Sequence, residues 1–288
     1  MKVEAYLVNS FTANGSGGNP AGVVLNADNL SNEAKLAIAQ AVGYSETAFV
    51  SQDDEVDFEL SFFTITGEVD FCGHATLAAF STMHQKGTVA EGQYVQRTKA
   101  GLLTVTIESN GNIVMELKLP EYLGMFSYEA ISELIGIDPA VLESTQLPIE
   151  VISTGLPDII VPVPCGYLDR IQVNESLLSD FCKKHDVIGI HAFELCDENS
   201  GLTASCRNFA PLFGIPEESA TGSASGALAC YLTKHLGGEH TSRFTFEQGR
   251  AMDCISIITA SVTSKEQDIL NVMVGGFAHE VGLLEISV

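Results

Sequence analysis

The chain opens two helices in the same way, once in each half of its sequence. The segments 71–76 and 220–224 each place a glycine beside small or polar residues where an apolar run of helical length begins. A helix that starts in this way leaves its first backbone N–H groups free to bind an anion. The two loops therefore predict a carboxylate-binding cleft between two related lobes.

A repeated order of elements supports duplication of one lobe. The turn and apolar strand at 18–25 resemble those at 155–161, and the helix and strand at 31–50 resemble those at 177–194. The matches occur in the same order in both halves, and an anion-binding loop follows them each time. We expect a tandem duplication whose equivalent loops face each other across a pseudo-twofold axis.

Local patterns indicate a mixture of helices and strands. Ser31 is a predicted N-cap, and Gly43 is expected to end the helix that follows it. The pair Asn110-Gly111 predicts a hairpin, because these residues tolerate positive φ. Strand-like alternation covers residues 1–8, 56–63, 103–107 and 113–119.

The length of 288 residues favours two domains. A break in the pattern near Pro120 suggests an N-terminal lobe of residues 1–120, completed by a C-terminal strand at about 277–288. Residues 121–276 then form the C-terminal lobe. We expect the active site in the cleft between the two lobes.

Composition excludes some partners. The net charge is −23, from 37 acidic and 14 basic residues, and no basic cluster is present, so nucleic acid and membrane surfaces are not expected partners. The amino terminus lacks the features of a signal peptide, and no apolar run reaches about 18 residues, so we expect a cytoplasmic protein. The seven cysteines contain no C-x-x-C pair, which favours reduced thiols.

Glu46 is the predicted general acid/base. It begins an apolar strand whose end should lie near the loop at Gly73, whereas the duplicated strand has Ile190 at the equivalent position. Partial desolvation there would raise the pKa of Glu46 toward the working pH. A carboxyl group poised in this way contributes about 10²–10⁴ in rate.

The two loops supply candidate groups for binding the substrate carboxylate. A helix N-terminus stabilises an anion by roughly 0.3–1 kcal/mol, and Gly73 and Gly222 would let the ligand approach the backbone closely. The helix dipole should keep His74 neutral. One carboxylate of the pair Glu217-Glu218 should face substrate and the other water.

Metal and cofactor sites are not expected. The seven histidines show no spacing typical of zinc ligands, and no glycine-rich phosphate loop occurs. The residues therefore favour an enzyme that uses neither a metal nor a cofactor.

Taken together, these segments resemble the PhzF-like family of phenazine biosynthesis, which shares the diaminopimelate epimerase fold. The blocks that carry the resemblance are 18–22, 45–49, 68–76, 207–211 and 214–224. The resemblance implies an α+β protein with two pseudo-symmetric lobes, each a barrel-like sheet around a central helix, and a homodimer. It also implies cofactor-independent isomerisation of a small carboxylate-bearing metabolite by proton transfer, with Glu46 as the acid/base. The substrate-binding residues that follow are Asn19, Cys72, Gly73, His74, Glu218, Thr221, Gly222 and Ser223.

The chain departs from the family at the acidic position before the second loop. Glu218-Ser219 stands where relatives have aspartate followed by proline. An alternative function is a two-thiol epimerase or racemase, in which Cys72 would be the first thiol, although Thr221 occupies the partner position. A thiol hydrolase built on Cys72 lacks an accompanying His/Asn pattern, and a catalytically silent metabolite-binding protein would keep the cleft without turnover.

Overall fold

The chain divides into two compact units. The computed structural model describes residues 2–237, 240–266 and 268–288. One unit comprises Met1–Glu116 with Gly275–Val288, and the other comprises Leu117–Val274. The description below treats each unit by itself.

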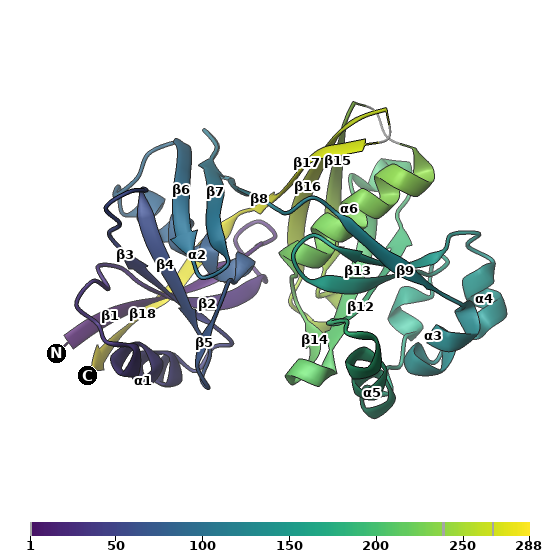
Figure 1. Ribbon diagram of the computed structural model, residues 1–288, viewed down its shortest axis with the longest axis horizontal. Helices are drawn as coiled ribbons and strands as arrows, with labels where there is room; N and C mark the ends of the chain where they lie inside the picture. The colour runs from purple at the N-terminus through teal and green to yellow at the C-terminus, as the bar shows by residue number, and fades with distance from the viewer. Residues whose placement is uncertain (1, 238–239, 267) are drawn as a thin grey trace. The chain divides into compact units, whose positions relative to one another are not determined.

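Strands of the first unit surround a buried helix (Figure 1). Strand β1 pairs antiparallel with both β18 and β2, and β2 runs parallel to β3. Strand β4 pairs with β3, β5 and β6. Strand β7 then pairs antiparallel with β6 and with β8. The helices and strands are β1 (Lys2–Ser10), β2 (Asn19–Val24), α1 (Asn32–Val42), β3 (Thr47–Ser51), β4 (Phe58–Phe63), β5 (Glu68–Val69), α2 (Gly73–Gln85), β6 (Gly92–Thr98), β7 (Gly101–Ile107), β8 (Ile113–Glu116) and β18 (Ala278–Ser287).

Helix α2 is the central helix of this unit. Every side chain from His74 to Met83 is buried. A helix that buries all of its faces must be enclosed, and α2 packs against β1, β2, β3, β8 and β18. The enclosure fixes the N-terminal end of α2, where the predicted site residues lie.

The second unit has the same construction around α6. Its helices and strands are β9 (Glu121–Phe126), α3 (Tyr128–Ile135), α4 (Pro139–Glu143), β10 (Ile149–Ser153), β11 (Pro157–Pro162), η1 (Leu168–Arg170), α5 (Glu175–His185), β12 (Gly189–Leu195), η2 (Glu198–Ser200), β13 (Ala204–Ala210), η3 (Pro211–Phe213), β14 (Ile215–Glu218), α6 (Gly222–Leu236), β15 (Thr241–Gln248), η4 (Arg250–Met252), β16 (Ser256–Lys265) and β17 (Asp268–Gly276), which runs past the unit boundary. Helix α6 buries Ala224 through Leu232 and packs against β10, β11, β15 and β16.

The strand pairings confirm the predicted duplication. In the first unit β1 and β2 are antiparallel, β2 and β3 parallel, β3 and β4 antiparallel, and β4 and β6 parallel. The second unit repeats this order with β10 and β11, β11 and β12, β12 and β13, and β13 and β15. Helix α1 therefore corresponds to α5, and α2 corresponds to α6.

Several local predictions are confirmed. The Ser31 hydroxyl accepts a hydrogen bond from the backbone N–H of Ala34, and Gly43 ends α1 with φ of 74°. Strands β7 and β8 form the predicted antiparallel hairpin around Gly111. The segment after Pro120, which was expected to interrupt the pattern of strands, is itself a strand in the structure: β9 begins at Glu121 and pairs with β10.

Among the described residues, no helix has both the length and the apolar character needed to cross a membrane.

Candidate functional site

Glu46 and His74 form a close pair in the first unit. Glu46 directly precedes β3, and its carbonyl oxygen accepts a hydrogen bond from Gly22 N–H, which fixes the strand end. His74 Nε2 lies 3.2 Å from Glu46 Oε2, and the two side chains are 7% and 18% exposed. The contact lacks hydrogen-bond geometry, and Oε2 is buried with no other donor among the described residues. The Glu46 carboxylate therefore faces the His74 ring with this buried oxygen.

The N-terminus of α2 holds His74 in this place. The Ser10 hydroxyl donates a 2.6 Å hydrogen bond to the His74 carbonyl oxygen, and Thr76 Oγ1 donates a 2.9 Å bond to the Cys72 carbonyl oxygen. Cys72 is the N-cap but makes no side-chain cap hydrogen bond. Its sulfur lies 3.4 Å from His74 Nδ1, so the ring sits between a thiol and a carboxylate.

The pair carries charges other than those expected from the sequence. Burial favours neutral Glu46, but its contact with His74 and a hydrogen bond from Ser45 outweigh burial and lower its pKa below the ordinary 4.5. Burial also opposes protonation of His74, but the hydrogen bond of the ring to the Cys72 sulfur and the nearby Glu46 carboxylate raise the pKa of His74 well above 6.5. The expectations of a raised pKa for Glu46 and a neutral His74 are therefore wrong, because a direct ion pair outweighs desolvation and the helix dipole.

Cys72 stays a thiol. Burial is the largest influence, and it raises the pKa of Cys72 above 9.0 although the His74 charge acts in the opposite direction. A buried protonated thiol is a poor base and a poor nucleophile.

Three possible metal ligands come together here although their spacing gave no sign of it. Ligand atoms of Glu46, Cys72 and His74 all lie within 4.8 Å of one another. Sulfur, nitrogen and carboxylate oxygen form a donor set that zinc accepts. The thiol and the imidazolium would first have to lose their protons.

Gly73 could carry a side-chain carbon without a clash. A Cβ built there would lie 3.8 Å from Met115 Cε and 3.9 Å from Phe71 Cε1, which are ordinary contact distances. Tight helix packing therefore does not require glycine at this position. Asn19, which is 5% exposed, lies opposite Ser10 in the pairing of β1 with β2, next to the residue that anchors His74.

The second loop carries its own hydrogen-bond network. Thr221 Oγ1 donates to Glu218 Oε2 at 2.9 Å, and Gln248 Nε2 donates to Thr221 Oγ1 at 3.1 Å and to the Glu218 carbonyl oxygen at 2.8 Å. Thr221 N–H in turn donates to Gln248 Oε1 at 3.2 Å. Gln248 was not among the predicted site residues, because it lies 24 residues or more beyond the blocks of sequence that carry the family resemblance.

Gly222 and Ser223 begin α6 as expected. Thr221 is the N-cap and makes no side-chain cap hydrogen bond, as Cys72 does at α2. The Ser223 carbonyl oxygen accepts a 2.9 Å hydrogen bond from Thr154 Oγ1, which ties the helix start to the turn before β11. Glu217 does not face water: it binds Arg207 through two hydrogen bonds of 2.8 and 2.7 Å.

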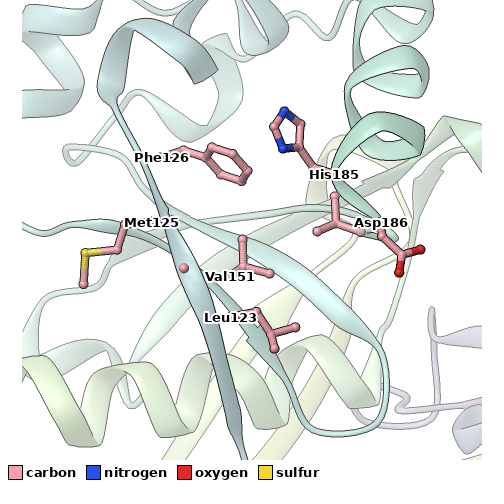
Figure 2. A pocket seen from close by; sticks show the side chains of 8 residues that line it. Leu123, Met125, Phe126, Val151, His185 and Asp186 are labelled. Carbon is pink, nitrogen blue, oxygen red and sulfur yellow. The ribbon is translucent and has the colours of Figure 1, made fainter.

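The structure thus gathers the predicted residues into two groups. Glu46, Cys72 and His74 come together in the first unit, and Glu218 and Thr221 come together in the second. That the two groups share one cleft stays a prediction. A cavity of about 210 Å³ in the second unit is lined by none of the predicted site residues (Figure 2).

Comparisons with known proteins place the chain in a family. The model of the phenazine biosynthesis-like proteins, PhzC-PhzF, matches residues 8–282. An uncharacterized isomerase of Clostridium acetobutylicum is 33% identical, with 96% of this chain and 95% of that protein covered. An uncharacterized isomerase of Escherichia coli is 32% identical, with 96% of both chains covered.

Solved structures agree on the fold. A Bacillus anthracis protein of the PhzF family superposes with a TM-score of 0.90 at 27% identity, covering 100% of both chains. A hydroxyproline epimerase from Agrobacterium vitis shares the fold alone, with a TM-score of 0.62 at 10% identity over 99% of this chain and 91% of that one. The fold is the α+β, diaminopimelate epimerase-like fold expected from the sequence, and the chain belongs to the phenazine biosynthesis-like PhzC-PhzF family.

Proposed function

We propose that this chain is an isomerase that moves a proton on a small carboxylate-bearing metabolite, with Glu46 as the general acid/base and without a cofactor. The observation that carries the proposal is the Glu46 carboxylate. Its Oε2 is buried, accepts no hydrogen bond from the described residues and lies 3.2 Å from His74 Nε2. The names of the Clostridium and Escherichia relatives as isomerases support the same reaction class.

The lowered pKa of Glu46 determines the order of the two proton transfers. Glu46 is ionised at neutral pH, so it first accepts a proton from a substrate carbon, and the electrons of the broken C–H bond remain on the substrate as an enolate-type anion. The protonated carboxyl group then returns that proton to another carbon. The imidazolium of His74 stabilises negative charge at the site throughout.

The N-terminus of α2 is the proposed seat of the substrate carboxylate. Its N-cap Cys72 makes no capping hydrogen bond, and Gly73 has room for close approach. The helix end and the His74 charge both favour an anion there. By the same logic, the uncapped start of α6 at Gly222, with Ser223, is a second carboxylate site.

A two-thiol epimerase fits the site less well. Burial keeps Cys72 protonated, and the equivalent N-cap of α6 is Thr221, whose hydroxyl is too weak an acid or base near neutrality. Cys72 is better suited to hold the His74 ring.

Solvent deuterium exchange tests the proposal. Small cyclic and amino carboxylates would be screened in deuterated water, and the Glu46→Gln variant compared with wild type on each metabolite that exchanges. We expect Glu46→Gln to lose at least about 10²-fold in exchange rate and to keep its carboxylate affinity. Glu59→Gln, on β4 of the same unit, is the matched control and should exchange like wild type.

Other outcomes would contradict the proposal in different ways. Full exchange by Glu46→Gln would remove Glu46 from the mechanism. Loss of exchange in Cys72→Ser with Glu46→Gln unaffected would favour the two-thiol epimerase. Metabolite binding by wild type without any proton exchange would favour a binding protein.

A further inference from the structure

A row of polar side chains, three of them buried, crosses four adjacent strands of the second unit. His191 on β12 lies opposite Asn208 on β13, and Asn208 lies opposite Glu218 on β14. Asp158 on β11 is two residues before Ile160, which is the partner of His191. Because paired residues, and residues two apart in a strand, share a face, all four polar side chains lie on one face of the sheet.

The opposite face of these strands packs in an apolar cluster of the unit. The residues that alternate with the polar row belong to that cluster, among them Ile159, Val161, Ile190 and Phe209. Asp158, His191 and Asn208 are nonetheless 1%, 0% and 2% exposed. Buried polar groups of this kind need partners.

Asn208 connects the row but supplies no charge. Its amide group donates a 3.2 Å hydrogen bond to His191 Nδ1 and also hydrogen-bonds to the Asp158 carboxyl group. Burial lowers the pKa of His191 to about 3, so the ring is neutral and cannot compensate a carboxylate. Asp158 Oδ1 and His191 Nε2 have no hydrogen-bond partner among the described residues.

Asp158 therefore shares its face of the sheet with an acid, and no cation pairs with it among the described residues. None of the ion pairs formed by the described residues includes Asp158, and the titratable groups near it are Glu218 on β14, His191 on β12 and Cys182 on α5. Burial and, next, the charge of Glu218 raise the pKa of Asp158 to about 8. The Glu218 carboxylate itself accepts a hydrogen bond from Thr221, the N-cap of α6.

We propose that Asp158 is a positioning residue that acts through Glu218, holding a proton beside it so that the two carboxyl groups carry one negative charge at the start of α6. A second charge there would oppose an anionic ligand on the N-terminus of this helix. The benefit to substrate binding rests on the proposed function, whereas the coupling between Asp158 and Glu218 does not.

Carbon-13 NMR of labelled side-chain carboxyl groups tests the coupling in the whole protein. In wild type, one carboxyl carbon signal should titrate with a midpoint near pH 8, and this titration should be absent from Asp158→Asn. Glu218→Gln removes the neighbouring charge and should move the Asp158 midpoint down by about one pH unit or more. Glu217→Gln is the matched control, because Glu217 is adjacent in sequence but binds Arg207, so the midpoint should stay.

The pH dependence of binding tests the positioning role. The affinity of wild type for a carboxylate found in the exchange screen should fall above pH 8, by up to about tenfold per pH unit. The isosteric, neutral Asp158→Asn side chain should remove this alkaline loss, which a merely structural role would not do. A wild type with no carboxyl step near pH 8, an Asp158 midpoint unmoved by Glu218→Gln, or the same alkaline loss in Asp158→Asn would each overturn the proposal.

Discussion

Replacing His74 with asparagine should raise the pKa of Glu46. The imidazolium lies 3.2 Å from Oε2, and an opposite charge this close lowers a carboxyl pKa by about 1–3 units. Without it, burial acts unopposed by any charge, so Glu46 in His74→Asn should titrate about 1–3 units higher than in wild type. At about 1.4 kcal/mol per unit, the pair contributes roughly 1.4–4 kcal/mol. Carbon-13 NMR of labelled glutamate carboxyl groups measures the shift directly.

The same pair predicts a window of pH for stability. Glu46 has a lowered pKa, so its contribution is present above about pH 4.5 and is lost as pH falls through its folded value. His74 has a raised pKa, so its contribution is fully present below 6.5 and is lost as pH rises through its folded value. The difference in unfolding free energy between wild type and His74→Asn should therefore be greatest between about pH 4.5 and 6.5.

Chemical denaturation at several pH values measures this window, and His84→Asn is the matched control. His84 lies near the other end of α2, where its Nδ1 is 3.2 Å from the Val89 carbonyl oxygen. The reasoning would be refuted by an unchanged Glu46 titration in His74→Asn, or by a stability difference that does not vary with pH.

Two further changes probe the loops and the acidic pair. Gly73→Ala should change the unfolding free energy by no more than about 0.5 kcal/mol, because the added Cβ meets only ordinary contacts. The same variant should bind the carboxylate ligand more weakly in calorimetry. A large loss of stability would mean that helix packing requires this glycine. Asp158→Asn should remove a loss of stability that wild type undergoes as pH rises from about 4 to about 8, since the folded pKa of Asp158 is raised from 3.8 to about 8. Parallel stability curves for wild type and Asp158→Asn across that range would contradict this expectation.

Local sequence signals predicted the ends of secondary-structure elements well wherever a single residue determines the backbone conformation. Ser31 and Gly43 define the ends of α1 because capping and left-handed φ are properties of those residues themselves. The duplication was visible because equivalent segments recur in order. The strand β9 was missed because Pro120 and Gly124 are typical of a turn, whereas pairing with β10 decides the structure of this segment.

Electrostatics could not be predicted in the same way. The sequence indicates that Glu46 and His74 approach each other, but the sign of a pKa shift depends on a contact of 3.2 Å and on its surroundings. Asp158 is a single acidic residue inside an apolar strand and gave no signal. Only the register of β11 to β14 shows that it shares a face with Glu218.

The two units show how one fold acquires two different charge states. Glu46 lies three residues after Gly43, which ends α1, and Gly189 lies three residues after Asp186, which ends α5. The second unit therefore has a glycine where the first has Glu46, and the sequence-based match of Glu46 with Ile190 is wrong by one residue. In the second unit the buried acid is Asp158 on β11, which forms no ion pair with the described residues, whereas Glu46 has the cation that His74 provides. A carboxylate beside a cation stays ionised, whereas a buried carboxyl group without one keeps its proton. The repeated backbone thus places two similar helix ends, and the different side chains beside them are the basis of the two roles that we propose, proton transfer at α2 and neutralised binding at α6.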